Sequence, residues 1–255
     1  MTDWTIQKDK MARKIVNELY EKGMILTWMS DPTHPGGWKL KSGLWSPFYI
    51  NLRLLPSHPM LMKTVGLAMS VMIQEECGHL DRLVGVAMAG IPIADVISYQ
   101  ANIPSCYTRK LENVNTLDDL EVAIKKYGSH SIIEGVLENN DKIAIVDDLV
   151  TKFDSKLIAF QQVYHEIANR KLTGMECKEV LVLFDREQGA VDEARSHKKN
   201  LRALIPFKSK GLQWLKDSFS EIEHDVISGY LDNPDKYQDE STIKDLEELA
   251  RGTRA

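Results

Sequence analysis

The chain has 255 residues, of which 43% are hydrophobic and 27% are charged, with 15 glycines and three cysteines. This composition excludes a disordered chain, a collagen-like repeat and a small domain held together by disulfides. The net charge of −5 argues against nucleic acid as a partner, although a local basic pocket is compatible with it.

The sequence also bears on where the protein works. No apolar run approaches the roughly 20 residues that cross a bilayer, so no membrane association is expected. The first residues lack the apolar centre of a signal peptide. Cys77, Cys106 and Cys177 have no C-x-x-C spacing, and the seven histidines are scattered, which argues against a protein-ligated metal. We therefore expect a cytoplasmic protein.

Short apolar runs alternate with helical stretches along most of the chain, which predicts an α/β protein with a parallel sheet and helices on both faces. The charged stretch from about 230 to 255 is typical of a solvated helix or a frayed end. In chain order we expect a helix over about 11–20 that stops at Gly23, a hairpin over 38–53, helices over 60–76 and 90–100, strands over 82–88, 105–110, 142–148, 179–185 and 201–207, and helices over about 155–170 and 190–198.

Two adjacent acids, Asp147 and Asp148, close a clearly apolar strand and precede a helix. Ligands of open parallel sheets bind beyond the carboxyl ends of the strands. Such a pair can accept hydrogen bonds from a vicinal diol, and the following turn, with Thr151 and Ser155, can hold a phosphate through N–H groups and hydroxyls. An ordinary strand end, with Asp154 or Ser155 as helix cap, explains the spacing equally well.

Other residues point to an anionic ligand. Gly90 follows a strand and opens a helix, so it permits close backbone approach to an anion, although an ordinary helix start has the same pattern. Arg109, Lys110 and Lys125 gather cations near the Tyr127-Gly128 turn, which suggests pyrophosphate binding on a mobile loop. A solvated charge cluster is the simpler explanation of these charges alone.

Aromatic and guanidinium groups could take a flat ligand. Phe48 and Tyr49 could stack on a heterocycle, although core packing is the commoner fate of such residues. Arg186 ends another strand, where its guanidinium could bind a carboxylate or carbonyls, or form an internal ion pair.

In their order and spacing these fragments resemble the orotate phosphoribosyltransferases, within the type I phosphoribosyltransferase family. The match spans about residues 9 to 205. The segments that carry it are Leu40-Lys41-Ser42-Gly43 with Ser46-Pro47-Phe48-Tyr49-Ile50-Asn51, Gly90-Ile91-Pro92, Arg109-Lys110 with Lys125-Lys126-Tyr127-Gly128, Val146-Asp147-Asp148, and Asp185-Arg186-Glu187-Gln188-Gly189.

The resemblance implies a type I phosphoribosyltransferase-like fold, with a five-stranded parallel core flanked by helices, a small N-terminal hood and a β-hairpin flap. It also implies a homodimer with shared active sites. The expected parts of a single structural domain are the N-terminal helix and hood hairpin at 1–55, the core at 56–207 with its flap at 109–135, and a C-terminal helical extension at 208–255.

The implied reaction transfers phosphoribosyl from 5-phosphoribosyl 1-pyrophosphate (PRPP) to orotate, giving orotidine 5'-monophosphate and pyrophosphate in pyrimidine biosynthesis, with Mg²⁺ carried by PRPP. Its transition state resembles that of glycosyl transfer. The resemblance gives the pyrophosphate to Lys41, Arg109, Lys110 and Lys125, with Gly90 and Tyr127 nearby, the ribose hydroxyls to Asp147 and Asp148, the 5'-phosphate to Thr151 and Ser155, and orotate to Phe48, Tyr49 and Arg186.

Three departures from the family pattern leave an alternative open. The phosphate turn is Thr151-Lys152-Phe153-Asp154-Ser155, where the family has glycines that let N–H groups wrap a phosphate. About a dozen extra residues separate Lys110 from Lys125 and make the flap longer and more acidic, and Ala89 stands where many members have a lysine. A non-catalytic or regulatory nucleotide-binding relative is the main alternative. A purine-base transferase and an unrelated doubly wound protein are weaker ones.

Overall fold

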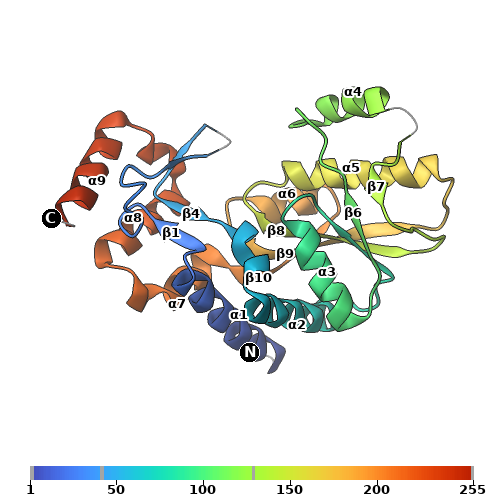
Figure 1. Ribbon diagram of the computed structural model, residues 1–255, viewed down its shortest axis with the longest axis horizontal. Coiled ribbons are helices and arrows are strands. Elements are labelled where there is room, and N and C mark those ends of the chain that lie inside the picture. The colour runs from blue at the N-terminus through green and yellow to red at the C-terminus, as the bar shows by residue number, and fades with distance from the viewer. Residues whose placement is uncertain (1–2, 41–42, 128–129, 254–255) are drawn as a thin grey trace.

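A twisted sheet forms the centre of the molecule in this computed structural model, which describes residues 3–40, 43–127 and 130–253 (Figure 1). Within these residues the sheet has six strands in the order β10-β9-β8-β5-β6-β7, and all neighbours are parallel except β6 and β7. The five-stranded parallel core is therefore confirmed. The strands of this sheet are β5 (Arg82–Gly85), β6 (Ser105–Thr108), β7 (Ile133–Glu134), β8 (Lys142–Val150), β9 (Glu176–Asp185) and β10 (Asn200–Pro206).

Helices cover both faces of the sheet, and the alternation of side chains along β8 shows how. Ala144 and Val146 join the hydrophobic cluster that contains α1, α2 and α3, whereas Ile143 and Ile145 join the cluster that contains α5 and α6. Such two-sided burial explains why β8 is apolar throughout. These helices are α1 (Asp3–Glu21), α2 (Pro59–Glu76), α3 (Gly90–Ala101), α5 (Asp154–Asn169) and α6 (Ala190–Ser196).

The N-terminal hood is built from two small antiparallel pairs. Strands β2 (Trp38–Lys39) and β3 (Trp45–Ser46) form the predicted hairpin, while β4 (Phe48–Ile50) pairs with β1 (Ile25–Thr27), which the sequence did not indicate. Gly23, in the left-handed region at φ 68°, ends the first helix as predicted.

The C-terminal extension packs on the hood, so its last helix (Glu240–Gly252) is not a frayed end, whereas the expected solvated helix is confirmed because most of its side chains are exposed. Ala250 is fully buried and the Trp28 indole donates to the Leu246 carbonyl at 3.1 Å. Only one face of the last helix is apolar, and the charged residues that dominate its composition occupy the others. The extension consists of η2 (Phe207–Gly211), α7 (Leu212–Trp214), η3 (Lys216–Ser218), α8 (Glu221–Asp232), η4 (Pro234–Tyr237) and α9 (Glu240–Gly252), and the remaining short helix, η1 (Leu52–Ser57), precedes α2.

The flap leaves and rejoins the sheet at the β6–β7 pair, where Thr108 lies opposite Ile133. Its acidic insertion forms a helix, α4 (Leu117–Tyr127), which lies over α5 in Figure 1. The sequence showed this segment only as an acidic interruption. Asp118 and Asp119 in the first turn of α4, and Lys125 and Lys126 in its last, match the helix dipole at both ends.

Candidate active site

The predicted site residues of the core gather where β8 and β9 end. Asp147 and Asp148 lie in the last part of β8, and Val150 pairs with Asp185 at the end of β9. The Arg186 N–H donates to the Val150 carbonyl at 3.0 Å. The structure thus brings the twin carboxylates, the turn at 151–155 and Arg186 to the same edge of the sheet, where α/β proteins bind ligands.

A buried lysine neutralises the first carboxylate. Lys156 is 2% exposed, and its ammonium contacts Asp147 Oδ2 at 2.5 Å, the Leu149 carbonyl at 3.0 Å and Ser155 Oγ at 3.2 Å. Asp147 Oδ1 also accepts the Asp148 N–H at 2.9 Å. Asp147 is therefore held rigidly by the protein itself, with its charge balanced.

Asp148 is the more accessible carboxylate of the pair. It is partly buried, and one of its oxygens accepts the Leu149 N–H at 2.7 Å. Burial and the adjacent charge of Asp147 raise the pKa of Asp148 to about 7, with Lys156 acting in the opposite direction. This carboxyl consequently changes its protonation state near neutral pH.

In the turn at 151–155, which is predicted to hold the phosphate, the bulky side chain of Phe153 does not lie on the outer face. Phe153 is fully buried under α5, where its ring lies 6.4 Å from that of Phe160. Lys152, Asp154 and Ser155 are exposed at the turn, and Thr151 is partly exposed. The bulk of Phe153 is thus removed from the position where it would obstruct a phosphate, whereas the charge of Asp154 remains at the surface.

Gly90 allows α3 to approach the end of β8. A Cβ atom at this position would lie 2.4 Å from the Val146 carbonyl oxygen and 3.0 Å from the Asp147 Cα, so no larger residue fits without movement. The Gly90 N–H donates to the Val86 carbonyl at 2.9 Å. The structure gives Gly90 a packing role next to Asp147, and its contact with a substrate anion stays a prediction.

Arg186 lies between the core and the hood. The residue is 7% exposed, and its guanidinium carbon lies 4.5 Å above the ring of Phe48. Within the described residues, Nε and Nη2 have no hydrogen-bond partner. Two unpartnered N–H groups on a buried guanidinium are costly unless a ligand accepts from them.

The two aromatic residues of the predicted platform point to opposite faces of β4, as successive strand residues do. Phe48 is 1% exposed beneath Arg186. Tyr49 is half-buried on the other face, where its ring stacks with that of Trp38 at 6.0 Å. Contact of either ring with a base stays a prediction, and Lys41 lies outside the described residues.

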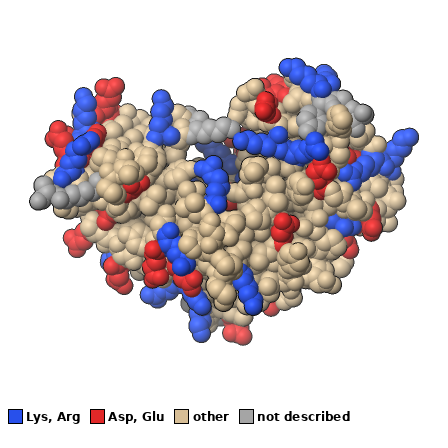
Figure 2. All heavy atoms as spheres, viewed as in Figure 1, with Lys and Arg blue, Asp and Glu red and all other residues tan. Residues whose placement is uncertain are grey.

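The predicted cations of the flap are exposed. Lys110 follows β6, and Lys125 lies in the last turn of α4. Arg109 forms an ion pair with Glu134 across the flap base. Tyr127 ends α4. Figure 2 shows a hollow between the hood and the part that carries α4, with lysine and arginine side chains along its rim.

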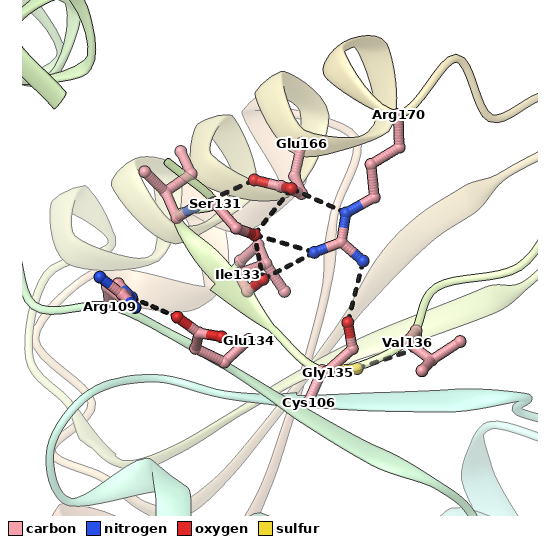
Figure 3. A network of polar contacts seen from close by, with 10 residues as sticks. Cys106, Arg109, Ser131, Ile133, Glu134, Gly135, Val136, Glu166 and Arg170 are labelled. Atoms are coloured by element: carbon pink, nitrogen blue, oxygen red, sulfur yellow. Dashed lines mark hydrogen bonds and ion pairs between the residues drawn. The ribbon is translucent and has the colours of Figure 1, made fainter. Parts of the chain in front are cut away.

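The flap base is held to α5 by a polar network that the sequence did not reveal (Figure 3). Glu166 is buried and accepts from the Ser131 hydroxyl at 2.8 Å, the Ile132 N–H at 3.0 Å and Arg170 Nε at 2.7 Å. Although burial opposes ionisation, these hydrogen bonds hold the pKa of Glu166 below its usual value. Immediately after β6, the Arg109 carbonyl accepts a hydrogen bond from the Gln162 side chain at 3.0 Å. Both ends of the flap are therefore fixed.

Lys156 is the most important site residue that the sequence interpretation missed. It shares a helical face with Ala159, Phe160 and Val163, all of which are buried. A charged residue at an apolar position of a helix needs a partner, and Asp147 and Asp148 are the acids at the end of the preceding strand. This periodicity was the available signal.

Relatives of this chain are orotate phosphoribosyltransferases. An orotate phosphoribosyltransferase of Methanothermobacter thermautotrophicus is 28% identical over 199 residues, which cover 78% of this chain and 96% of that protein. One of Sulfolobus acidocaldarius is 30% identical over 199 residues, which cover 77% of this chain and 89% of that protein. The chain belongs to the orotate phosphoribosyltransferase family. It is accordingly a phosphoribosyltransferase by class, although no family model matches it.

Solved structures of this family share the fold. An orotate phosphoribosyltransferase from Aeropyrum pernix superposes with a TM-score of 0.59 and 21% identity, covering 80% of this chain and 97% of that one. UMP synthase from Leishmania donovani gives 0.69 and 24% identity, covering 87% of this chain but only 42% of that longer one. The type I phosphoribosyltransferase-like architecture is thereby confirmed.

Two kinds of feature are absent from the part of the chain that the structure describes. In residues 3–40, 43–127 and 130–253 no helix is long and apolar enough to span a bilayer. In the same ranges, no three His, Cys, Asp or Glu side chains converge so that they could hold a metal ion.

Proposed function

We propose that this chain transfers the phosphoribosyl group of PRPP to orotate, releasing pyrophosphate and forming orotidine 5'-monophosphate. Membership of the family supports the reaction class. The observation that carries the choice of base is Arg186, whose two unpartnered nitrogens suit the carboxylate of orotate. The same guanidinium would leave a purine base with buried donors unsatisfied.

In this proposal the protein positions the reactants and stabilises charge, and supplies no nucleophile. Asp148, when ionised, accepts hydrogen bonds from the ribose hydroxyls and balances positive charge on the sugar in the transition state. Thr151 and Ser155, with the first N–H groups of α5, take the 5'-phosphate. Lys110 and Lys125 approach the departing pyrophosphate when the flap covers the site, together with Lys41 and Arg109.

Three further features belong to the proposal. Mg²⁺ would be carried by PRPP, whose oxygens are the hard ligands this ion prefers. Two copies of the chain form a dimer in which flap cations of one copy serve the site of the other. The enzyme works in the cytoplasm, as the absence of a C-x-x-C pair and its three free cysteines suggest.

The reaction is tested with purified protein, Mg²⁺ and PRPP by following pyrophosphate release with and without orotate. Release that depends on orotate is expected, with no release for adenine or hypoxanthine. We expect Asp148→Asn to lower kcat by about 100-fold or more, whereas the exposed Asp245→Asn serves as a matched control without effect. Absence of orotate-dependent release, together with measurable orotate binding, would favour the non-catalytic alternative.

The ion and the dimer need separate measurements. Removal of Mg²⁺ with a chelator should abolish PRPP binding in calorimetry as well as turnover. Mixing the Lys125→Ala and Asp148→Asn variants should restore activity that neither has alone, because a hybrid dimer contains one site with both residues intact. If the mixture stays inactive while light scattering shows exchanged dimers, the sites are not shared.

A further inference from the structure

A second protein segment contacts the base-recognition arginine, and it comes from the C-terminal extension. Tyr230 in α8 is 1% exposed, and its ring lies 5.9 Å from the guanidinium carbon of Arg186. It meets the rings of Phe48 and Trp45 edge to face at 6.0 and 6.3 Å. Arg186 thus lies beside two adjacent aromatic rings, Phe48 of the hood and Tyr230 of the extension.

The unpartnered atoms of Arg186 form one edge of the guanidinium. Nε and Nη2 direct parallel N–H bonds, which is the edge that binds a carboxylate in bidentate fashion. Such an edge recognises a carboxylate well only if the planar group cannot rotate away. Phe48 covers one face of the plane at 4.5 Å, so the remaining freedom depends on what lies beside the third nitrogen, Nη1.

Tyr230 is the residue of the extension that lies beside the guanidinium, with its ring 5.9 Å from the guanidinium carbon. Burial lowers the pKa of Arg186, and its hydrogen-bonding and electrostatic interaction with Tyr230 opposes that shift. The position of Tyr230 is itself well defined, because Ser220 and Glu223 form a capping box at the start of α8. Glu223 also accepts a hydrogen bond from Thr27 in the hood.

We propose that Tyr230 is a positioning residue for base recognition, holding Arg186 so that its Nε–Nη2 edge receives the carboxylate of the base. This inference rests on the proposed function, since it presumes a base that carries a carboxylate. It gives the C-terminal extension a part in the active site. Tyr230 acts through Arg186 and does not touch the reacting atoms.

The test compares Tyr230→Phe with Tyr237→Phe, which removes a hydroxyl from the neighbouring ring 6.1 Å away. For Tyr230→Phe we expect the KM and the calorimetric Kd for orotate to rise about tenfold, as for loss of a hydrogen bond to a charged group. The KM for PRPP and the calorimetric Kd for uracil, which lacks the carboxylate, should stay unchanged. Tyr237→Phe should behave as the unaltered protein.

A coupling experiment separates positioning from a general effect on folding. Once Arg186→Lys has removed the bidentate edge, adding Tyr230→Phe should weaken orotate binding no further. Equal loss for orotate, uracil and PRPP, or additive losses in the double variant, would overturn the inference. If the unaltered protein turns over orotate and Tyr230→Phe matches it, only this inference fails, whereas no turnover in the unaltered protein refutes the proposed function.

Discussion

Replacing Lys156 by methionine should destabilise the protein strongly, because the ammonium is the buried partner of Asp147. Both residues are more than nine-tenths buried, at 2% and 8% exposed, and their charged atoms lie 2.5 Å apart. Breaking such a pair costs about 3–5 kcal/mol, because it leaves a charge without compensation. Asp147 retains the N–H of Asp148 at 2.9 Å, so we expect the lower value, about 3 kcal/mol.

Urea unfolding measures this loss as a lower midpoint at unchanged slope. For a chain of this size, about 3 kcal/mol corresponds to a decrease in Tm of about 6–12 °C. The exposed Lys152→Met in the same turn is the matched control and should change the free energy of unfolding by less than about 0.5 kcal/mol.

A double variant tests the cause. Asp147→Asn combined with Lys156→Met removes both charges and should recover stability to within about 1 kcal/mol of the unaltered protein. If Lys156→Met is as stable as the Lys152→Met control, or if the two substitutions simply add, then the ion pair does not hold the end of β8 and the reasoning is refuted.

Three other expectations concern pH, the flap and α3. The kcat/KM for PRPP should fall as the pH drops below about 7, because Asp148 then takes up a proton. The stability should change in the opposite direction: protonation of Asp148 favours the folded state, so its contribution to the free energy of unfolding is lost as the pH rises through about 7. Asp148→Asn should remove both effects. Glu166→Gln should weaken the flap base by about 2 kcal/mol, which amide exchange measures as faster exchange in β6 and β7. Because the pKa of Glu166 is lowered, the stabilisation that Glu166 provides should be lost only in acid, below its usual pKa of about 4.3. Unchanged exchange would contradict the anchoring role. Gly90→Ala should cost about 1–3 kcal/mol in thermal or urea unfolding, since its Cβ would lie 2.4 Å from the Val146 carbonyl, whereas Gly252→Ala, with nothing within 4 Å, should be neutral; equal stability of the two would refute the packing argument.

The core of the fold could be predicted because its information is local. The apolar run that forms β8 and the helical spacing of apolar residues in α5 can each be recognised within about a dozen consecutive residues. The helix α4 was not predicted, because it is short and begins with acidic residues, and its buried residue is Leu120. Its packing on α5 depends on a partner far along the chain.

For the site, the positions of residues along the strands could be predicted, but their tertiary partners could not. The strand-end positions of Asp148 and Arg186 followed from the alternation of strands and helices. The partners of Arg186 did not, because Phe48 and Tyr230 are separated from it and from each other by long stretches of chain. Tertiary contacts between distant aromatic residues leave no periodic signal in the sequence.

The docking of the extension on the hood has a consequence for biosynthesis. Trp28 donates its indole N–H to Leu246, 218 positions later, so the early strands lack their covering until nearly the whole described chain has been translated. At about 5–20 residues per second, the ribosome needs on the order of ten to forty seconds to make that stretch. During this interval the aromatic side chains of the hood are exposed to solvent on the nascent chain, and a chaperone that shields them would raise the yield of native enzyme.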